Sequence, residues 1–289
     1  MDKKRQARQV SEILGLSLFL AMLLLLLSSL FLHFLNIEET VPLLLIQLLL
    51  RAAVFLLPIG FVRMAFIKMR TPVPFFSRRS SAGRRFLIGI SSVGFVVILQ
   101  ILYSSVFPSS MMTMGVSRQT TLGELILMFF AYVTAPAVWE EFYFRGTVMR
   151  ALTIHRKLLA LLISSLAFGL MHVSLEQFPI AFLCGLIIGT AYLATASLGC
   201  AVFIHLICNL IWYAAEMIRV FWEPGYSLFM NIVFALCVVL VVAGIPTIKL
   251  TFATVVEDRD DVAPSSYFWS VPMALFLVAA VCITIFWQG

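Results

Sequence analysis

The sequence predicts an all-α fold, a polytopic membrane bundle of about eight or nine transmembrane helices. Hydrophobic residues make up 62% of the 289 residues, charged residues make up only 12%, and the mean hydropathy is +1.05. Soluble domains carry about 25% charged residues, so this composition excludes a soluble globular protein. Since a spanning helix uses roughly 20 apolar residues, the apolar content suffices for about nine spans. We expect a single transmembrane domain over residues 1–289.

Nine apolar runs follow one another along the chain, and each is typical of a helix surrounded by lipid. They cover residues 11–35, 42–66, 86–107, 122–146, 158–175, 178–197, 200–220, 226–248 and 267–287. The first run is longer than the apolar region of a signal peptide, and no small-residue cleavage site follows it. We therefore interpret it as a span that stays in the protein. The fifth and sixth runs are short and close together, which leaves the count between eight and nine.

The positive charges alternate between the two sides that nine spans define. Seventeen of the 20 Lys and Arg residues fall on one side, in the N-terminus and in the segments after the second, fourth and eighth spans, whereas Arg118 and Arg219 fall on the other. Because Lys and Arg concentrate in cytoplasmic loops, we expect the N-terminus to be cytoplasmic. We predict an integral protein of a bacterial cytoplasmic membrane. Its net charge of +6 then indicates contact with membrane lipid, and no nucleic-acid partner.

Several ionisable or strongly polar residues lie inside the apolar runs. An ionised side chain at the centre of a span costs about 2.5–3.5 kcal/mol on insertion scales, so each one indicates a function or a specific partner. They are Arg51 in the second run, Glu140, Glu141 and Arg145 in the fourth, His172 in the fifth, and His205 and Asn209 in the seventh. For Arg51 we expect an ion pair or snorkelling, with no assigned role.

Helical spacing distinguishes the two glutamates. Glu141 and Arg145 are four residues apart, share a helix face and are expected to form a structural ion pair. Glu140 is rotated by about 100° from its neighbour and is left free to act. Glu140 and His172 are equally distant from the polar turn at residue 156, so they lie level, about 24 Å from that turn. For His205 to reach this depth, the hairpin of the fourth and fifth spans must project into the cytoplasm.

Glu140, His172, His205 and Asn209 in one cavity would suit the activation of water. A carboxylate shielded from bulk water is a stronger proton acceptor and can serve as a general base. His205 and Asn209 can donate hydrogen bonds to the oxyanion of a tetrahedral intermediate. Alternatively, Glu140, His172 and His205 could bind zinc and leave one position open for water; a metal-free mechanism is equally compatible. Each His and Asn, taken singly, is also typical of a helix-packing hydrogen bond.

The sequence lacks the motifs that are typical of two other classes of intramembrane protease. The chain has no GxSxG serine motif and no Asp pair within the spans, which argues against serine and aspartyl intramembrane proteolysis. Two further classes of function remain open from the residues. Intramembrane Glu and His also mark ion pathways, so an ion-coupled transporter is one alternative. A non-catalytic immunity or scaffold protein of the same shape is the other.

Three motifs carry a resemblance to a known family. Residues 140–146 read EEFYFRG and resemble the EExxFRG signature, residues 168–172 read FGLMH and resemble FxxxH, and residues 205–209 read HLICN and resemble HxxxN. In this order they are similar to the CPBP family, which includes the CAAX prenyl endopeptidases and the Abi proteins. The resemblance covers about residues 122–220, the expected catalytic core, with 1–121 and 221–289 as accessory spans. Ala196 stands where the family more often has Gly.

The resemblance implies an intramembrane endopeptidase that acts on a membrane-anchored or lipidated peptide, including a prenylated C-terminal substrate. It implies that Glu140 with His172 activates the attacking water and that His205 with Asn209 stabilises the oxyanion. Glu141 and Arg145 would hold the local structure. The family has been described both as metalloproteases and as metal-free, glutamate-dependent proteases, so zinc stays open. Gly185 and Gly189 have the spacing of a GxxxG helix-packing motif.

Overall fold

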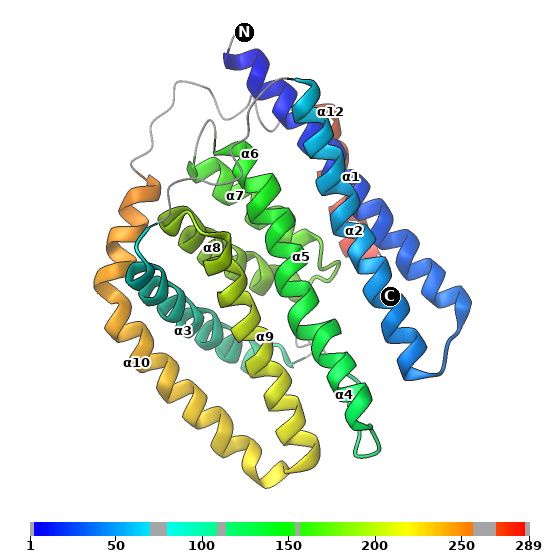
Figure 1. Cartoon of the computed structure of the whole chain (residues 1–289), viewed down its shortest axis with the longest axis vertical. Helices are drawn as coiled ribbons and strands as arrows, with labels where there is room; N and C mark the ends of the chain where they lie inside the picture. The colour runs from blue at the N-terminus through cyan, green and yellow to red at the C-terminus, as the bar shows by residue number, and fades with distance from the viewer. Residues whose placement is uncertain (1–2, 70–79, 109–113, 154–156, 257–269, 287–289) are drawn as a thin grey trace.

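The computed structural model of the chain describes residues 3–69, 80–108, 114–153, 157–256 and 270–286, and all regular structure in these ranges is helical (Figure 1). Within the described ranges, seven helical segments are long and apolar enough to cross a membrane, and two shorter apolar helices accompany them. The predicted polytopic helical bundle is thus confirmed. The helices outside the fourth span are α1 Lys3–Leu35, α2 Thr40–Lys68, α3 Ala82–Val106, α7 Lys157–Leu170, α8 Gln177–Thr195, α9 Leu198–Phe221, α10 Glu223–Val256 and α12 Val271–Phe286.

The fourth span, residues 122–152, consists of five consecutive helical pieces. It begins at a capping box, in which the hydroxyl of Thr121 accepts from the backbone N–H of Glu124 and the Glu124 carboxylate accepts from the backbone N–H of Thr121. α-Helical geometry then alternates with wider π-helical turns. The pieces are α4 Leu122–Phe129, η2 Phe130–Thr134, α5 Ala135–Tyr143, η3 Phe144–Met149 and α6 Arg150–Leu152.

Both π-helical turns have local causes. Pro136 has no N–H and its ring crowds the carbonyl of Tyr132, so the backbone widens through η2 before α5 begins. At η3, side chains take over backbone acceptors: the Thr147 hydroxyl donates to the Phe142 carbonyl at 3.1 Å, and the Ser164 hydroxyl of α7 donates to the Phe144 carbonyl at 2.9 Å. η2 lies directly before α5 and η3 directly after it, so the two turns flank the segment that holds Glu140 and Glu141.

The helices form two outer groups with the fourth span between them (Figure 1). α1 packs against α2 and α12 at one edge, and α3 packs against α10 at the other. Buried apolar side chains of α1, α2, α3, η3, α7, α8 and α9 join in one core. Two polar contacts tie α1 into it, because the hydroxyls of Ser11 and Ser270 lie 2.8 Å apart and those of Ser17 and Tyr143 lie 3.0 Å apart.

Two glycines let α8 approach its neighbours closely. A Cβ on Gly185 would lie 3.2 Å from the Cα of Ser165 on α7. A Cβ on Gly189 would lie 2.6 Å from the side-chain end of Leu161 and 2.7 Å from that of Met149, so both side chains would have to move. The structure therefore uses the GxxxG spacing for helix packing, the interpretation that the spacing alone favours.

The end of the fifth span differs from the sequence expectation. The apolar run predicts a helix to residue 175, but α7 ends at Leu170 and His172 lies in the following turn. The chain reverses there through Val173, whose φ of +51° is rare for a β-branched residue. His155 and the centre of the turn between the fourth and fifth spans lie outside the described residues. The projection of that hairpin beyond the membrane stays a prediction.

Candidate active site

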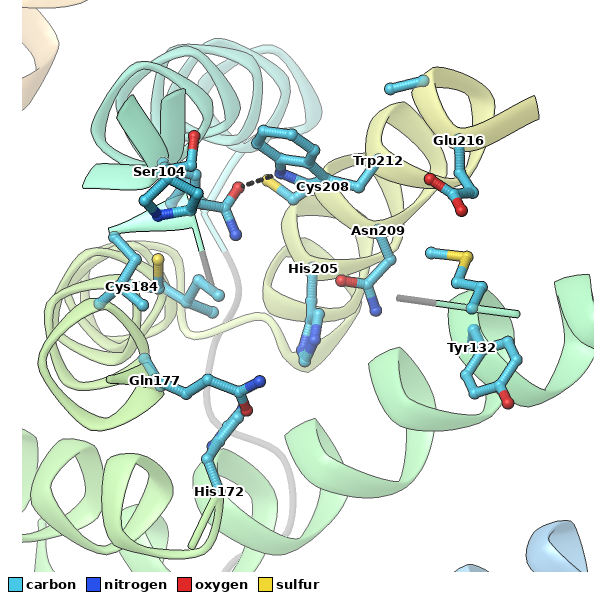
Figure 2. A pocket seen from close by; sticks show the side chains of 18 of the residues that line it. Ser104, Tyr132, His172, Gln177, Cys184, His205, Cys208, Asn209, Trp212 and Glu216 are labelled. Carbon is cyan, nitrogen blue, oxygen red and sulfur yellow. Dashed lines mark hydrogen bonds between the residues drawn. The ribbon is translucent and has the colours of Figure 1, made fainter. Parts of the chain in front are cut away.

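The predicted catalytic residues meet where two cavities adjoin. One cavity has a volume of about 520 Å³ and extends between α3, α8 and α9; the other has about 440 Å³ and extends toward α1, α2 and α5. Glu140 lines the smaller cavity. The residues that line both are Tyr132, Phe168, His172, Gln177, His205 and Asn209. Figure 2 shows His205 and Asn209 projecting from α9 into the space that His172 and Gln177 face from the opposite wall.

A buried ionic cluster holds one of the two histidines. The Nη1 group of Arg145 donates to Oε1 of Glu141 at 2.9 Å, and both side chains are fully buried. The same Oε1 lies 2.9 Å from Nδ1 of His205. The expected ion pair between Glu141 and Arg145 is therefore present, but the pair also reaches a third residue 64 positions away, which helical spacing did not predict.

This contact assigns the protons of His205. A carboxylate paired with Arg145 is ionised and can only accept, so Nδ1 of His205 carries the hydrogen. In the neutral ring Nε2 then has a free lone pair, and only the imidazolium form can donate from Nε2 to an oxyanion. Glu141 thus orients His205 and fixes its Nδ1 as the donor, in addition to pairing with Arg145.

Phe168 connects the three motifs. Its ring lies 4.7 Å from the guanidinium carbon of Arg145, a cation–π contact. The ring also packs edge-on near His172 and His205, with centroid separations of 5.1 Å and 5.9 Å. Arg145 is held further by the carbonyl of Gly185, to which its Nη2 group donates at 3.1 Å. The first residue of the FxxxH motif therefore supports side chains from the other two motifs.

His172 has one tautomer fixed by the backbone. Its Nδ1 lies 2.9 Å from the carbonyl oxygen of Phe168, and because a carbonyl can only accept, Nδ1–H is the donor. Nε2 of the neutral ring is then free to accept a proton. The ring is accessible to the cavity although protein surrounds it, and the side chains of Glu140, His205 and Arg51 lie within electrostatic range of it. The ring is thus arranged to accept a hydrogen bond from water.

Glu140 and Asn209 face the cavity, and no described residue pairs with either side chain. Neither side chain forms a hydrogen bond or an ion pair with any residue in the described ranges, and each is half-buried. The interpretation of Asn209 as a hydrogen-bonding link between helices therefore gains no support. Glu140, in contrast to Glu141, is available to a bound molecule, as the rotation between adjacent helical positions indicated. The catalytic roles of these residues stay predictions.

The predicted zinc ligands share a cavity but do not converge. Across the described part of the chain, no three His, Cys, Asp or Glu side chains lie close enough together to hold a metal ion. Protein acceptors engage Nδ1 of both His172 and His205, so each ring has only Nε2 left to offer. Glu140, His172 and His205 thus do not fit a three-ligand zinc site in this arrangement. Zinc binding stays a prediction, and no step below passes through a metal.

Three residues of the site were not identified from the sequence. Arg51 of α2 lines the smaller cavity, where we expected only an ion pair or snorkelling. Tyr132 lines both cavities and lies eight residues before Glu140, a spacing that suggests a shared face. Gln177 lines both cavities from the first turn of α8. The signal that was available for Arg51 was its charge within an apolar run.

Comparison with known proteins supports the motif assignment. Residues 122–211 match the family described as type II CAAX prenyl endopeptidase Rce1-like. This segment is roughly a third of the chain and contains all three motifs. No curated protein and no solved structure matches the chain. This match supports the resemblance drawn from the motifs: residues 122–211 of this integral membrane protein are similar to the CAAX-type intramembrane proteases.

Proposed function

We propose that the protein is a glutamate-dependent intramembrane endopeptidase that hydrolyses a peptide bond of a membrane-anchored substrate. One observation carries the proposal. An unpaired carboxylate, that of Glu140, shares a cavity with two imidazoles whose Nδ1 atoms are both engaged by protein acceptors. The side-chain amide of Asn209 completes the polar set. Hydrolysis of an amide by water requires a general base and hydrogen-bond donors that stabilise the oxyanion. Both kinds of group surround this cavity.

The first step is attack by water on the amide. A water molecule donates one hydrogen to the Glu140 carboxylate and the other to Nε2 of His172, which orients its lone pair toward the peptide carbonyl carbon. The water oxygen bonds to that carbon as Glu140 takes the proton, and the carbonyl electrons move onto oxygen. When this oxyanion collapses, the C–N bond breaks, and Glu140 returns the proton to the leaving amine. Glu140 therefore ends the cycle ionised, as it began.

The oxyanion is stabilised from α9. The amide of Asn209 can donate to it in any charge state, whereas His205 donates from Nε2 only as an imidazolium. Glu141 orients His205 for this role, because its carboxylate accepts from Nδ1 of the ring at 2.9 Å. Glu141 and Arg145 thus act as positioning residues in this mechanism. Removing one oxyanion donor from a hydrolase costs on the order of 100- to 1,000-fold in kcat.

The surroundings of the site suit a lipidated substrate. A groove of about 700 Å³ lies between α2 and the α4–α5 part of the fourth span. Its lining is apolar apart from Thr134, and Trp139 lies directly before Glu140 in the chain. A hydrocarbon chain in this groove would bring its attached peptide toward Glu140. We propose a lipidated, for example prenylated, C-terminal peptide as substrate, with membrane lipid as the surrounding partner and the N-terminus in the cytoplasm of a bacterium.

Cleavage by purified variants tests this function. Wild-type protein in detergent micelles is incubated with a prenylated CaaX peptide, and the products are identified by mass. We expect Glu140→Ala and His172→Ala each to lower kcat by at least about 100-fold. Glu38→Ala and His33→Ala, both exposed and lining neither active-site cavity, are matched controls and should keep wild-type activity. Full activity in Glu140→Ala would refute the mechanism.

The metal question is answered on the same samples. In the proposed mechanism a chelator leaves kcat unchanged, and metal analysis finds less than one equivalent of zinc per active chain. Loss of activity with the chelator and recovery with zinc would instead establish the metal-dependent alternative. An ion-coupled transporter would show Glu140-dependent uptake into vesicles and no peptide cleavage.

A further inference from the structure

Arg51 is a cation near the middle of a spanning helix. It lies eleven residues after Thr40, the first residue of the 29-residue α2, which places it about 17 Å along the helix axis. Its side chain is half-buried and lines the cavity of about 440 Å³ that contains Glu140 and His172. A charge at this depth is costly unless water or a counter-ion accompanies it, and such residues typically mark a functional site.

Among the residues that the structure describes, none supplies a counter-ion to Arg51. No described residue forms a hydrogen bond or an ion pair with its guanidinium, although it is within electrostatic range of His172 and Tyr132. Glu141 pairs with Arg145 and His205 and does not line this cavity. Among the described residues that line this cavity, Glu140 is the single carboxylate, and it lies outside ion-pair distance of Arg51. The cavity thus presents a cation without an anion of its own.

We propose that Arg51 binds a carboxylate of the substrate, namely the free C-terminal carboxylate of the peptide. This inference rests on the proposed endopeptidase function. A guanidinium binds a carboxylate through two parallel hydrogen bonds, and the pair is stronger where water is scarce. A terminal carboxylate inside the membrane is costly without a partner of opposite charge, and so is the guanidinium of Arg51.

The size of the cavity favours a chain terminus over an internal segment. Its volume of about 440 Å³ lies at the lower end of ligand pockets, which measure about 300–1,000 Å³. An extended peptide advances about 3.3–3.6 Å per residue, so only a few residues fit beyond the scissile bond. The reacting residues line the junction with the larger cavity. The leaving fragment would occupy the smaller cavity with its carboxylate at Arg51, and the preceding part of the substrate would occupy the larger one.

Three prenylated peptides of one sequence test the assignment. The first ends in a free carboxylate, the second in a C-terminal amide, and the third in an amide with glutamate as its last residue. We compare kcat/KM for wild-type protein, Arg51→Gln and Arg51→Lys. The matched control is Arg63→Gln, which removes a charge from the exposed face of the same helix and lines neither active-site cavity.

We expect wild-type protein and Arg63→Gln to prefer the free carboxylate over the amide by about 10- to 100-fold, the value of charge-assisted hydrogen bonds. Arg51→Gln should lose this preference and still cleave the amide peptide within a few-fold of wild type. Arg51→Lys should keep part of the preference, because it retains the charge without the paired geometry. If Arg51→Gln does not fold, the preference of Arg51→Lys for the acid over the amide tests the inference in its place.

Each of the following outcomes contradicts the inference or the proposed function on which it rests. Equal cleavage of acid and amide by wild-type protein, or an unchanged preference in Arg51→Gln and Arg51→Lys, would overturn it. An equal loss on all three peptides would mean that Arg51 acts through Glu140 rather than on the substrate. If the glutamate-ended amide is cleaved as fast as the peptide with a free carboxylate, Arg51 binds an acidic side chain rather than the chain terminus. If wild-type protein cleaves none of the peptides, the proposed function itself fails.

Discussion

Replacing Glu141 by glutamine tests the buried cluster that joins the fourth span to α9. Glu141→Gln preserves the shape of the side chain but removes the charge that Arg145 and His205 share. Two hydrogen bonds of 2.9 Å end on the same carboxylate oxygen. The amide oxygen of glutamine can still accept both hydrogen bonds, so the loss arises from the missing charge. Removing one partner of a buried ion pair costs about 3–5 kcal/mol, because the other charge is left uncompensated.

The expected result is a large loss of stability. At about 2–4 °C per kcal/mol for a chain of this size class, a loss of 3–5 kcal/mol lowers the Tm by about 6–20 °C. Tm is measured by intrinsic fluorescence in detergent micelles. The control is Glu216→Gln, which breaks the pair between Glu216 and Arg219, whose Arg side chain is 51% exposed. An exposed pair contributes about 0–1 kcal/mol, so this control should shift Tm by only a few degrees.

The reasoning would be refuted if Glu141→Gln unfolded at the same temperature as Glu216→Gln. The activity of the folded fraction gives a second readout. Because His205 loses the carboxylate that orients its ring, kcat should fall by about 100-fold or more while KM changes little. A change confined to KM would mean that the cluster acts on substrate binding instead.

Two further predictions concern backbone and packing. Ala196 ends α8 with φ +49°, so Ala196→Gly should raise the free energy of unfolding by about 1 kcal/mol, whereas Ala194→Gly, inside α8, should lower it by about 0.5–1 kcal/mol. Equal shifts in Tm would contradict this reasoning. Gly185→Ala should cost about 1–3 kcal/mol, because its Cβ meets the backbone of Ser165 at 3.2 Å. Gly83→Ala, where nothing lies within 4 Å, should be neutral or stabilising; a Gly185→Ala variant as stable as this control would rule out the close contact between α7 and α8.

Local spacing allowed some of the site to be predicted from the sequence. The apolar runs predicted the helical class, and the four-residue separation of Glu141 and Arg145 predicted their ion pair. Both depend on contacts within one segment. The departure of Ala196 from the more common glycine was also visible, but its consequence, a left-handed backbone at the end of α8, was not.

Long-range contacts could not be predicted in the same way. The bond between Glu141 and His205 depends on how α5 and α9 pack, which no spacing within either helix reports. The end of α7 before His172 was missed because apolar residues continue past it, and the reversal at Val173 is imposed by the neighbouring structure. Arg51 was noticed as a misplaced charge, but the face of α2 that meets the cavity became known only from the structure.

The pairing of Glu141 with Arg145 within one continuous span has a consequence for biogenesis. A helix that enters the lipid phase with a single exposed charge would partition poorly, but these two opposite charges lie one turn apart and can neutralise each other before any other helix is present. Within the fourth span the pair therefore leaves Glu140 as the intramembrane carboxylate that has no neighbouring cation to neutralise it. His205 joins the pair only when α9 packs against α5, so this contact of the cluster forms after the contact between Glu141 and Arg145.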